Sequence, residues 1–297
     1  MDLENSIKFQ LNKILSHPKK LQLDINNIDT LVFSGGGVKG LYYIGIIKKL
    51  EELNILKNIN IITGTSIGAF FAALISINFS SKDLIDFVLL FNLSKMKKIK
   101  SSNFFSFFGI DDGNNLEIIL ENMFENKGFA KEITFKQLYD KTKKELIISG
   151  VCINEKKCHY FSHKSTPNMN VIKAIRISTS IPIYFTPVLY ENKLWVDGAI
   201  IDNYPIHLFK NRLNKTLGIY LSEKKELTSI NNLEDYFICI IESLLEGLAI
   251  KCTNGYENNT IIINSDNINI INTDFSKEKI LEFINIGYDA ISSNLIN

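Results

Sequence analysis

The most constraining feature of this 297-residue chain is the pentapeptide Gly-Thr-Ser-Ile-Gly at positions 64–68. It follows a short apolar, β-branched run over 59–63 and precedes a helix-forming apolar stretch. A serine on a tight strand-to-helix turn is typical of a nucleophile elbow, in which Gly64 and Gly68 relieve the crowding that a Cβ would cause. The pattern predicts acyl transfer through a covalent intermediate at Ser66. The alternative is a strand–helix connection without chemistry.

A second glycine-rich turn lies upstream, at residues 35–40, with the sequence Gly-Gly-Gly-Val-Lys-Gly. It follows an apolar strand pattern over 29–34 and opens a stretch from Leu41 in which apolar residues recur at helical spacing. Successive glycines leave their backbone N–H groups uncovered, so these groups can converge on an anion. The residues of this predicted cradle are Gly35, Gly36, Gly37, Val38, Lys39 and Gly40.

Three kinds of anion site have a turn of this type. The spacing Gly-x-Gly-x-x-Gly over 35–40 matches the dinucleotide fingerprint, which also requires an acidic residue at the end of the next strand. That strand ends instead in Thr-Gly-Thr at 63–65, and Glu51 and Glu52 lie earlier, on the predicted helix. A Walker phosphate loop fails because no Gly-Lys-Ser/Thr follows at the required spacing. The oxyanion of an intermediate formed at Ser66 is therefore favoured, and each donor to it contributes about 3 kcal/mol in the transition state.

An acidic residue ends a third predicted strand. Residues 194–199 have the sequence Leu-Trp-Val-Asp-Gly-Ala, and Pro205 marks the return to irregular chain. In isolation, an aspartate at a strand end is most often a turn former or a helix cap. Beside a serine turn and a triple-glycine turn, Asp197 becomes the natural partner of Ser66.

These motifs, in this order, resemble those of the patatin-like phospholipase family. The block over 174–188 is similar to the Pro- and Phe-containing segment ahead of the family's aspartate. The resemblance covers residues 29–205 and implies an α/β three-layer sandwich, with a mainly parallel central sheet and helices on both faces. It also implies a lipid acyl hydrolase with a Ser-Asp dyad, in which Ser66 is the nucleophile, Asp197 is its base and the amides of residues 36–38 form the oxyanion hole.

The substrates that the resemblance implies are carboxyl esters of glycerophospholipids, cleaved as by a phospholipase A. A neutral-lipid lipase or transacylase with the same residues is one alternative, and a catalytically silent lipid-binding scaffold is another. The chain departs from the family pattern where Asp197 is followed by Gly-Ala and not by Gly-Gly. Alanine is small, so we expect little consequence.

A catalytic triad is the alternative to the dyad, because the order Ser66, Asp197, His207 suits the Ser-acid-His arrangement of α/β hydrolases. The resemblance favours the dyad. An ordinary aspartate, with a pKa near 4, is a poor base for a hydroxyl at neutral pH, and burial raises the pKa of a carboxyl group. The dyad therefore predicts that Asp197 is buried, hydrogen-bonded to Ser66 and within reach of the leaving-group oxygen.

Units of strand, glycine turn and helix indicate a mainly parallel sheet in a single catalytic domain. The predicted division is an N-terminal helical extension over 1–28, the catalytic domain over 29–230 and a C-terminal helical region over 231–297 packed on the same domain.

Three elements are expected in the C-terminal region: a helix over 233–250, a strand over 261–264 and a closing helix over 277–295. The side chains that the closing helix is expected to turn inward are Ile280, Leu281, Ile284, Tyr288 and Ile291.

Charge and cysteine content bear on partners and cofactors. Lys and Arg number 33 against 32 Asp and Glu, which argues against a nucleic-acid partner. The spacing of the four cysteines fits neither a zinc site nor a disulfide framework. Cys158 and His159 form a pair of metal-ligand type, but no second pair completes it, so we expect no metal and no other cofactor.

Two observations bear on where the protein acts. The first residues lack the basic and apolar regions of a secretory signal, and no apolar run approaches the length of about 18 residues that a spanning helix needs. We expect a cytoplasmic or host-cytosolic enzyme that contacts a phospholipid membrane surface transiently. The pattern assigns neither an activator nor an oligomeric state.

The segment 95–108 combines lysines with phenylalanines. One interpretation is contact with an anionic bilayer, in which the phenylalanines enter the acyl boundary. The other is a charged surface turn followed by core phenylalanines in a helical lid over the cleft.

Overall fold

The structure is a computed structural model that describes residues 21, 23–96, 98, 102–223, 252–265 and 273–295, with several single positions between 230 and 271. The strands are β1 (Thr30–Phe33), β2 (Ile61–Gly64), β3 (Gly109–Asp111), β4 (Glu145–Cys152), β5 (Lys157–Phe161), β6 (Ile183–Phe185), β7 (Val188–Tyr190), β8 (Lys193–Asp197), β9 (Thr216–Glu223) and β10 (Thr260–Ser265). The α-helices are α2 (Leu41–Glu52), α3 (Ile67–Ser76), α4 (Ser81–Leu90), α5 (Asn103–Phe107), α6 (Asn114–Asn126), α7 (Phe135–Thr142), α8 (Val171–Ser178) and α10 (Lys277–Leu295). Shorter 3-10 turns are η1 (Ile25–Asn27), η2 (Gly37–Gly40), η3 (Ile55–Asn58), η4 (Leu93–Met96), η5 (Gly198–Ile200), η6 (Pro205–Phe209), η7 (Leu213–Lys215) and η8 (Glu257–Asn259).

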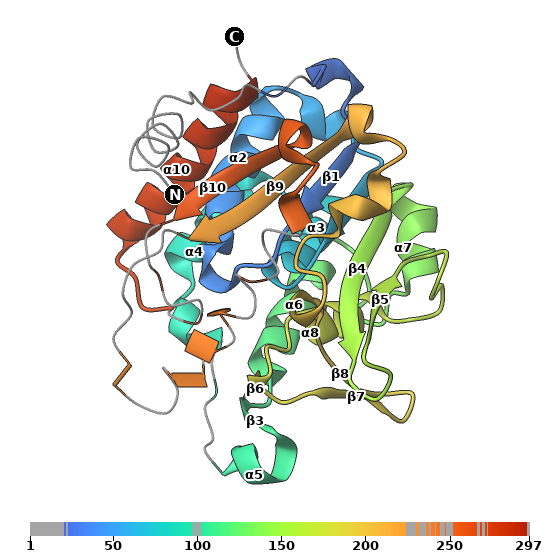
Figure 1. Cartoon of the computed structure of the whole chain (residues 1–297), viewed down its shortest axis with the longest axis vertical. Helices are drawn as coiled ribbons and strands as arrows, with labels where there is room; N and C mark the ends of the chain where they lie inside the picture. The colour runs from blue at the N-terminus through green and yellow to red at the C-terminus, as the bar shows by residue number, and fades with distance from the viewer. Residues whose placement is uncertain are drawn as a thin grey trace, which may run out of the picture.

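The centre of the described part is an eight-stranded sheet in the order β10-β9-β1-β2-β4-β8-β7, with β5 paired to β4. The pairs from β10 to β4 are parallel, whereas β5, β7 and β8 pair in antiparallel fashion. Figure 1 shows this sheet running through the molecule, with α2 and α10 beside β9 and β10. The predicted α/β fold with a mainly parallel central sheet is confirmed.

Alternate side chains of the parallel strands enter two separate cores. In β1, Leu31 and Phe33 belong to the larger cluster and Val32 to the smaller one. The same alternation separates Ile62 from Ile61 in β2. Helices α2, α3, α4, α8 and α10 cover the larger core, whereas the smaller core lies under η6. Both faces of the sheet are therefore covered, which is why its inner strands are predominantly apolar.

The predicted closing helix is present as α10, which packs along α2. Of its predicted inward residues, Ile280, Ile284 and Ile291 are buried. The prediction for Leu281 is wrong, because its side chain is 41% exposed and Phe283 is buried instead. Successive helical residues are rotated by about 100°, so Leu281 lies to the side of the stripe that the buried residues form.

The C-terminal segment also contributes to the central sheet, since β10 pairs in parallel with β9. Most of the predicted N-terminal extension over 1–28, and most of the predicted helix over 233–250, lie outside the described residues. None of the described helices is both long enough and apolar enough to cross a bilayer.

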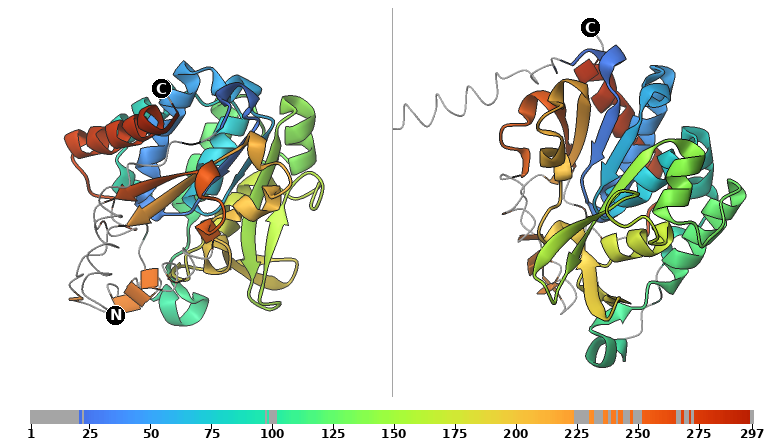
Figure 2. Two further views of the ribbon diagram at one scale, coloured as in Figure 1. Left: turned by 45° about the horizontal axis from the view of Figure 1, so that its top comes forward. Right: turned by 90° about the vertical axis from the view of Figure 1, so that its right-hand side faces the viewer.

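The segment 95–108 forms η4 and α5, with residues 97 and 99–101 outside the described part. Phe107 and Phe108 are 60% and 63% exposed, so the interpretation as core phenylalanines is wrong for these two residues. Figures 1 and 2 show α5 projecting at the lower end of the molecule, whereas α10 lies toward the upper end.

The parallel topology brings the glycine turns together. Strands β1 and β2 are neighbours and end at the same edge of the sheet, with Phe33 opposite Gly64. The amide of Thr65 donates to the carbonyl oxygen of Phe33 at 3.3 Å, so the two turns begin in direct contact.

Candidate active site

Ser66 occupies the turn between β2 and α3, with φ 56° and ψ −126°. Residues with a side chain rarely adopt this conformation, which costs on the order of 1–3 kcal/mol. The turn also requires both flanking glycines. A Cβ at Gly64 would lie 2.3 Å from the carbonyl oxygen of Gly68, and a Cβ at Gly68 would lie 2.5 Å from that of Ser34. The crowding that the sequence pattern predicts at this turn is therefore present.

The hydroxyl of Ser66 donates a hydrogen bond of 2.6 Å to Oδ2 of Asp197. Asp197 is only 2% exposed, and its Oδ1 accepts a second bond of 2.8 Å from the amide of Ala199. Burial raises the pKa of Asp197 to about 7, although both hydrogen bonds lower it. The predicted burial of this carboxylate and its bond to Ser66 are confirmed.

Asp197 reaches this position because β8 runs antiparallel to β4 and ends opposite Gly150. Its own amide donates to the carbonyl oxygen of Ser180 at 2.9 Å. The next residue, Gly198, lies against Ser149, whose Oγ would be 2.2 Å from a Cβ at position 198. Ala199 contributes only its backbone amide to the carboxylate, so alanine in place of the family's second glycine leaves this bond unchanged.

The amides of the glycine turn divide into two groups. Those of residues 36–38 have no hydrogen-bond acceptor within the described part of the chain. The amide of Gly35 donates instead to the backbone oxygen of Asn203 at 3.1 Å and to its Oδ1 at 3.0 Å. The amide of Lys39 donates to the carbonyl oxygen of Gly36 at 3.1 Å, and Gly40 is the N-cap of α2. Of the predicted cradle, residues 36–38 thus keep their N–H groups available.

Two residues that the sequence analysis missed hold the turns in place. Asn203, which is buried, accepts the amide of Gly35, as described above. Ser178, at the end of α8, accepts the amide of Ser66 on its Oγ at 2.9 Å. The one local signal for Asn203 is its place between Asp197 and Pro205, where a short polar residue is a common turn former. No local signal marks Ser178.

The guanidinium of Arg176 is buried and supports Ser180, whose carbonyl oxygen accepts the amide of Asp197. Arg176 is 2% exposed and donates to Ser180 Oγ at 2.5 Å and to the carbonyl oxygen of Asp112 at 2.9 Å. Burial lowers the pKa of Arg176. Through Ser180, Arg176 therefore connects Asp197 to the chain just before α6.

His207 has partners other than Asp197. Its Nδ1 lies 3.6 Å from Asp202 Oδ2, and its Nε2 lies 3.4 Å from the hydroxyl of Tyr160. The carboxylate of Asp197 is instead bonded to Ser66 and Ala199. Among the described residues, therefore, no histidine extends the Ser66–Asp197 hydrogen bond into a chain of the Ser-Asp-His type.

The other histidines do not gather around a metal site. His159 bonds to Glu155 at 2.7 Å, and His163 stacks on Tyr139 with ring centres 3.8 Å apart. His17 lies outside the described residues. Across the residues that the structure describes, no three His, Cys, Asp or Glu side chains are grouped as ligands for a metal ion.

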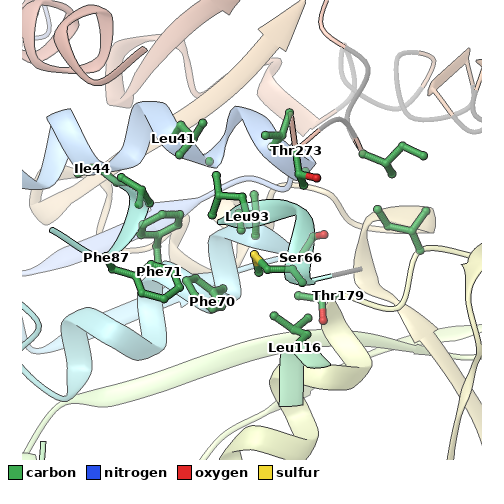
Figure 3. Close-up of a pocket in the computed structure, with 18 of the residues that line it drawn as sticks. Leu41, Ile44, Ser66, Phe70, Phe71, Phe87, Leu93, Leu116, Thr179 and Thr273 are labelled. Carbon is green, nitrogen blue, oxygen red and sulfur yellow. The ribbon is translucent and has the colours of Figure 1, made fainter. Parts of the chain in front are cut away.

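A cavity of about 160 Å³ opens beside Ser66. Its wall is formed largely by apolar side chains of α2, α3 and α4, and the described lining contains no lysine or arginine. Figure 3 shows Ser66 and Thr179 on one side of this pocket and Ile44, Phe71 and Phe87 grouped on the other. The arrangement suits a long apolar group whose polar end lies at Ser66.

The raised pKa of the buried Asp197 predicts how the stability of the protein depends on pH. The pKa of Asp197 is about 7 in the folded protein and 3.8 for an ordinary aspartate. Between these values the folded state binds the extra proton, so the free energy of unfolding falls as the pH rises. We expect the stability advantage of Asp197→Asn over the natural protein to grow by about 2–3 kcal/mol between pH 5 and pH 8. Urea unfolding at both pH values measures it.

The control for this experiment is Asp140→Asn. Asp140 lies at the surface, 2.9 Å from Lys136, which lowers its pKa. Both states of the chain are then ionised at this position above pH 5, so the effect of the substitution stays constant up to pH 8. An equally constant effect for Asp197→Asn would contradict the raised pKa.

Comparison with known proteins places this site in a family. The family model for patatin-like phospholipases matches residues 31–210. The chain is 33% identical to the uncharacterized protein R571 of Acanthamoeba polyphaga mimivirus, over 76% of this chain and 78% of that protein. It is 30% identical to the probable lipid hydrolase 463L of Invertebrate iridescent virus 6, over 67% of this chain and 70% of that protein.

A solved structure has the same fold. The crystal structure of VipD from Legionella pneumophila superposes with a TM-score of 0.59 at 17% sequence identity, covering 96% of this chain and 72% of that one. The matched range 31–210 spans more than half of the chain and includes both glycine turns and Asp197. The chain therefore belongs to the patatin-like phospholipase family, as its motifs predict.

Proposed function

We propose that this protein is a serine lipid acyl hydrolase that cleaves carboxyl esters of glycerophospholipids. The observation that carries the proposal is the 2.6 Å hydrogen bond from Ser66 to the buried carboxylate of Asp197, beside an apolar pocket. Membership of the patatin-like phospholipase family supports it, as does a relative named a probable lipid hydrolase.

In the acylation step, Asp197 acts as the base. Ser66 Oγ attacks the ester carbonyl carbon while its proton passes to Asp197 Oδ2. A carboxylate with a pKa of about 7 is ionised in a large fraction of molecules at neutral pH and still has appreciable proton affinity. The proton then moves from Asp197 to the leaving alcohol oxygen, which departs and leaves an acyl-enzyme on Ser66.

The amides of residues 36–38 serve as the oxyanion hole in this proposal. They lack acceptors among the described residues, and they follow β1 at the edge where β2 leads to Ser66. Donors held by the backbone need no reorganisation when negative charge develops on the carbonyl oxygen, and one such donor contributes about 3 kcal/mol to the transition state.

Deacylation uses the same groups in reverse. Asp197 takes a proton from a water molecule, whose oxygen attacks the acyl carbon. The tetrahedral intermediate collapses, Ser66 regains a proton from Asp197 and the fatty acid leaves. The apolar pocket holds the acyl chain throughout, and each buried methylene stabilises binding by about 0.8 kcal/mol.

A neutral-lipid lipase or transacylase is the second candidate. The observation that favours it is the pocket wall, in which no described residue is a lysine or arginine that would bind a phosphate. An apolar wall of this kind binds the acyl chain of a lipid and does not contact its head group. Mass spectrometry of the products from mixed phospholipid and triacylglycerol vesicles identifies which ester is cleaved.

The roles of Ser66 and Asp197 are tested with a soluble short-chain ester. We expect Ser66→Ala and Asp197→Asn each to lower kcat by at least about 10³-fold, because each removes a group that takes part in bond making. His207→Ala should remain within about threefold of the natural protein, since its ring contacts Tyr160 and Asp202 and not the dyad.

A fluorophosphonate probe separates an enzyme from a silent scaffold. Labelling of the natural protein at Ser66, absent in Ser66→Ala, supports the proposal. A folded protein that takes no label is a scaffold, and a folded His207→Ala variant without activity refutes the dyad.

A separate prediction concerns Asn203, which positions the glycine turn in this proposal. Asn203→Ala removes the Oδ1 that accepts the amide of Gly35. This amide then keeps only the backbone oxygen of residue 203 as its acceptor, so the glycine turn is held less firmly. We expect kcat to fall by about 10–100-fold with little change in KM, because misplaced donors weaken the transition state more than the bound ester.

The matched control is Asn259→Ala. Asn259 is also buried, and its side-chain amide donates to the carbonyl oxygens of Leu213 and Thr216, at the opposite end of β9 from the site. This variant should lose stability without the selective loss of kcat. Equal kinetic effects in the two variants would contradict a positioning role for Asn203.

A further inference from the structure

Helix α5 carries an exposed aromatic pair that the fold does not use. Phe107 and Phe108 are 60% and 63% exposed at the end of a five-residue helix. The right-hand view of Figure 2 shows this helix standing out from the body of the molecule. Two adjacent large apolar side chains left in water on a projecting element are typical of an interaction site.

A different residue of α5, Phe104, contacts another part of the protein. Phe104 lies 6.1 Å from Phe237, ring centre to ring centre. Phe108 ends the helix in the left-handed conformation, with φ 61°, and its amide donates to the carbonyl oxygen of Phe104 at 3.1 Å. Glycine or asparagine is the usual residue at such a position, whereas this chain has a phenylalanine that is largely exposed.

The backbone that carries the exposed pair adjoins a residue of the apolar pocket. Phe108 is followed directly by Gly109, which pairs with Ile183 where β3 meets β6. A Cβ at Gly109 would lie 2.4 Å from the backbone carbon of Phe185, and Phe185 lines the pocket beside Ser66. Phe185 is itself partly exposed, so it belongs to the rim of the pocket. The residue that follows the aromatic pair is therefore packed against a residue of the pocket lining.

Positive charge accompanies the pair on the same segment. Lys95 and Lys98 are exposed, and neither forms an ion pair with a residue that the structure describes. The neighbouring Asp111 is buried, and its carboxylate accepts the amides of Lys98 and Gly113. Lysines near an anionic bilayer are attracted to its negative surface potential.

We propose that Phe107 and Phe108 insert into the acyl boundary of an anionic bilayer while Lys95 and Lys98 contact its head groups. This surface, the α5 anchor, places the rim of the apolar pocket against the membrane. A lipid acyl chain then reaches Ser66 without crossing bulk water. Only the delivery of an acyl chain to Ser66 rests on the proposed function. The membrane-binding surface itself does not depend on catalysis.

A bilayer fits this surface better than a protein partner. A standard protein interface buries about 800 Å² on each side, which is far larger than two side chains on a five-residue helix. Two aromatic rings flanked by lysines meet instead the requirements of interfacial insertion, which combines shallow apolar burial with attraction to anionic lipids.

The test measures binding to vesicles of phosphatidylcholine with and without phosphatidylglycerol. We expect Phe107→Ser/Phe108→Ser to weaken binding to the mixed vesicles by at least tenfold, while hydrolysis of a soluble ester stays within about twofold. Lys95→Glu/Lys98→Glu should weaken binding to the anionic vesicles and leave binding to phosphatidylcholine alone unchanged. The matched control is Leu281→Ser, an exposed leucine on α10, a helix that lies apart from α5 in Figure 1, and it should bind as the natural protein does.

Several outcomes would overturn the α5 anchor. One is unchanged vesicle binding in the double serine variant, and another is equal loss of binding and of soluble-ester hydrolysis, which indicates a packing role. A third is concentration-dependent self-association through the pair without vesicle binding. If the natural protein lacks hydrolase activity, vesicle binding by the Ser66→Ala variant still tests the anchor, so the two failures are distinguishable.

Discussion

The hydrogen bond between Ser66 and Asp197 is the interaction on which the rest of the structure depends. It joins the end of β2 to the end of β8, two points 131 residues apart in the chain, and both residues are buried. Burial raises the pKa of the carboxyl group to about 7, and in the proposed mechanism this change makes Asp197 an effective base at neutral pH. The same burial costs stability, because an ionised carboxylate is favoured in water. In the proposed mechanism, the protein gives up stability for reactivity at this site.

One short turn coordinates the parts of the site. Between residues 197 and 203, the chain supplies the carboxylate that faces Ser66, a carbonyl oxygen at Asp202 that accepts the hydroxyl of Thr65, and the acceptors of Asn203 for the glycine turn. A shift of this turn therefore moves Asp197, the serine turn and the glycine turn together. This shared support explains how three segments that are distant in the chain keep one geometry.

The local parts of this architecture were predictable from sequence, and the long-range parts were not. A strand followed by glycines and a helix is a short-range pattern, so both turns, the helices after them and the mainly parallel sheet could be predicted. The family pattern added the pairing of Ser66 with Asp197. The contacts of Asn203 and Ser178 span 168 and 112 residues, and no spacing rule marks them. The inward face of α10 was misjudged at Leu281 because the exact position of the stripe depends on how the helix packs on α2.

The pH dependence of kcat/KM for a soluble ester tests the central claim most directly, since it reports the ionisation of the free enzyme's base. If Asp197 is that base, the rate constant rises tenfold per pH unit at low pH and levels off above an apparent pKa of about 7. A profile that levels off near pH 4, or one that stays flat between pH 5 and pH 8, would contradict the account.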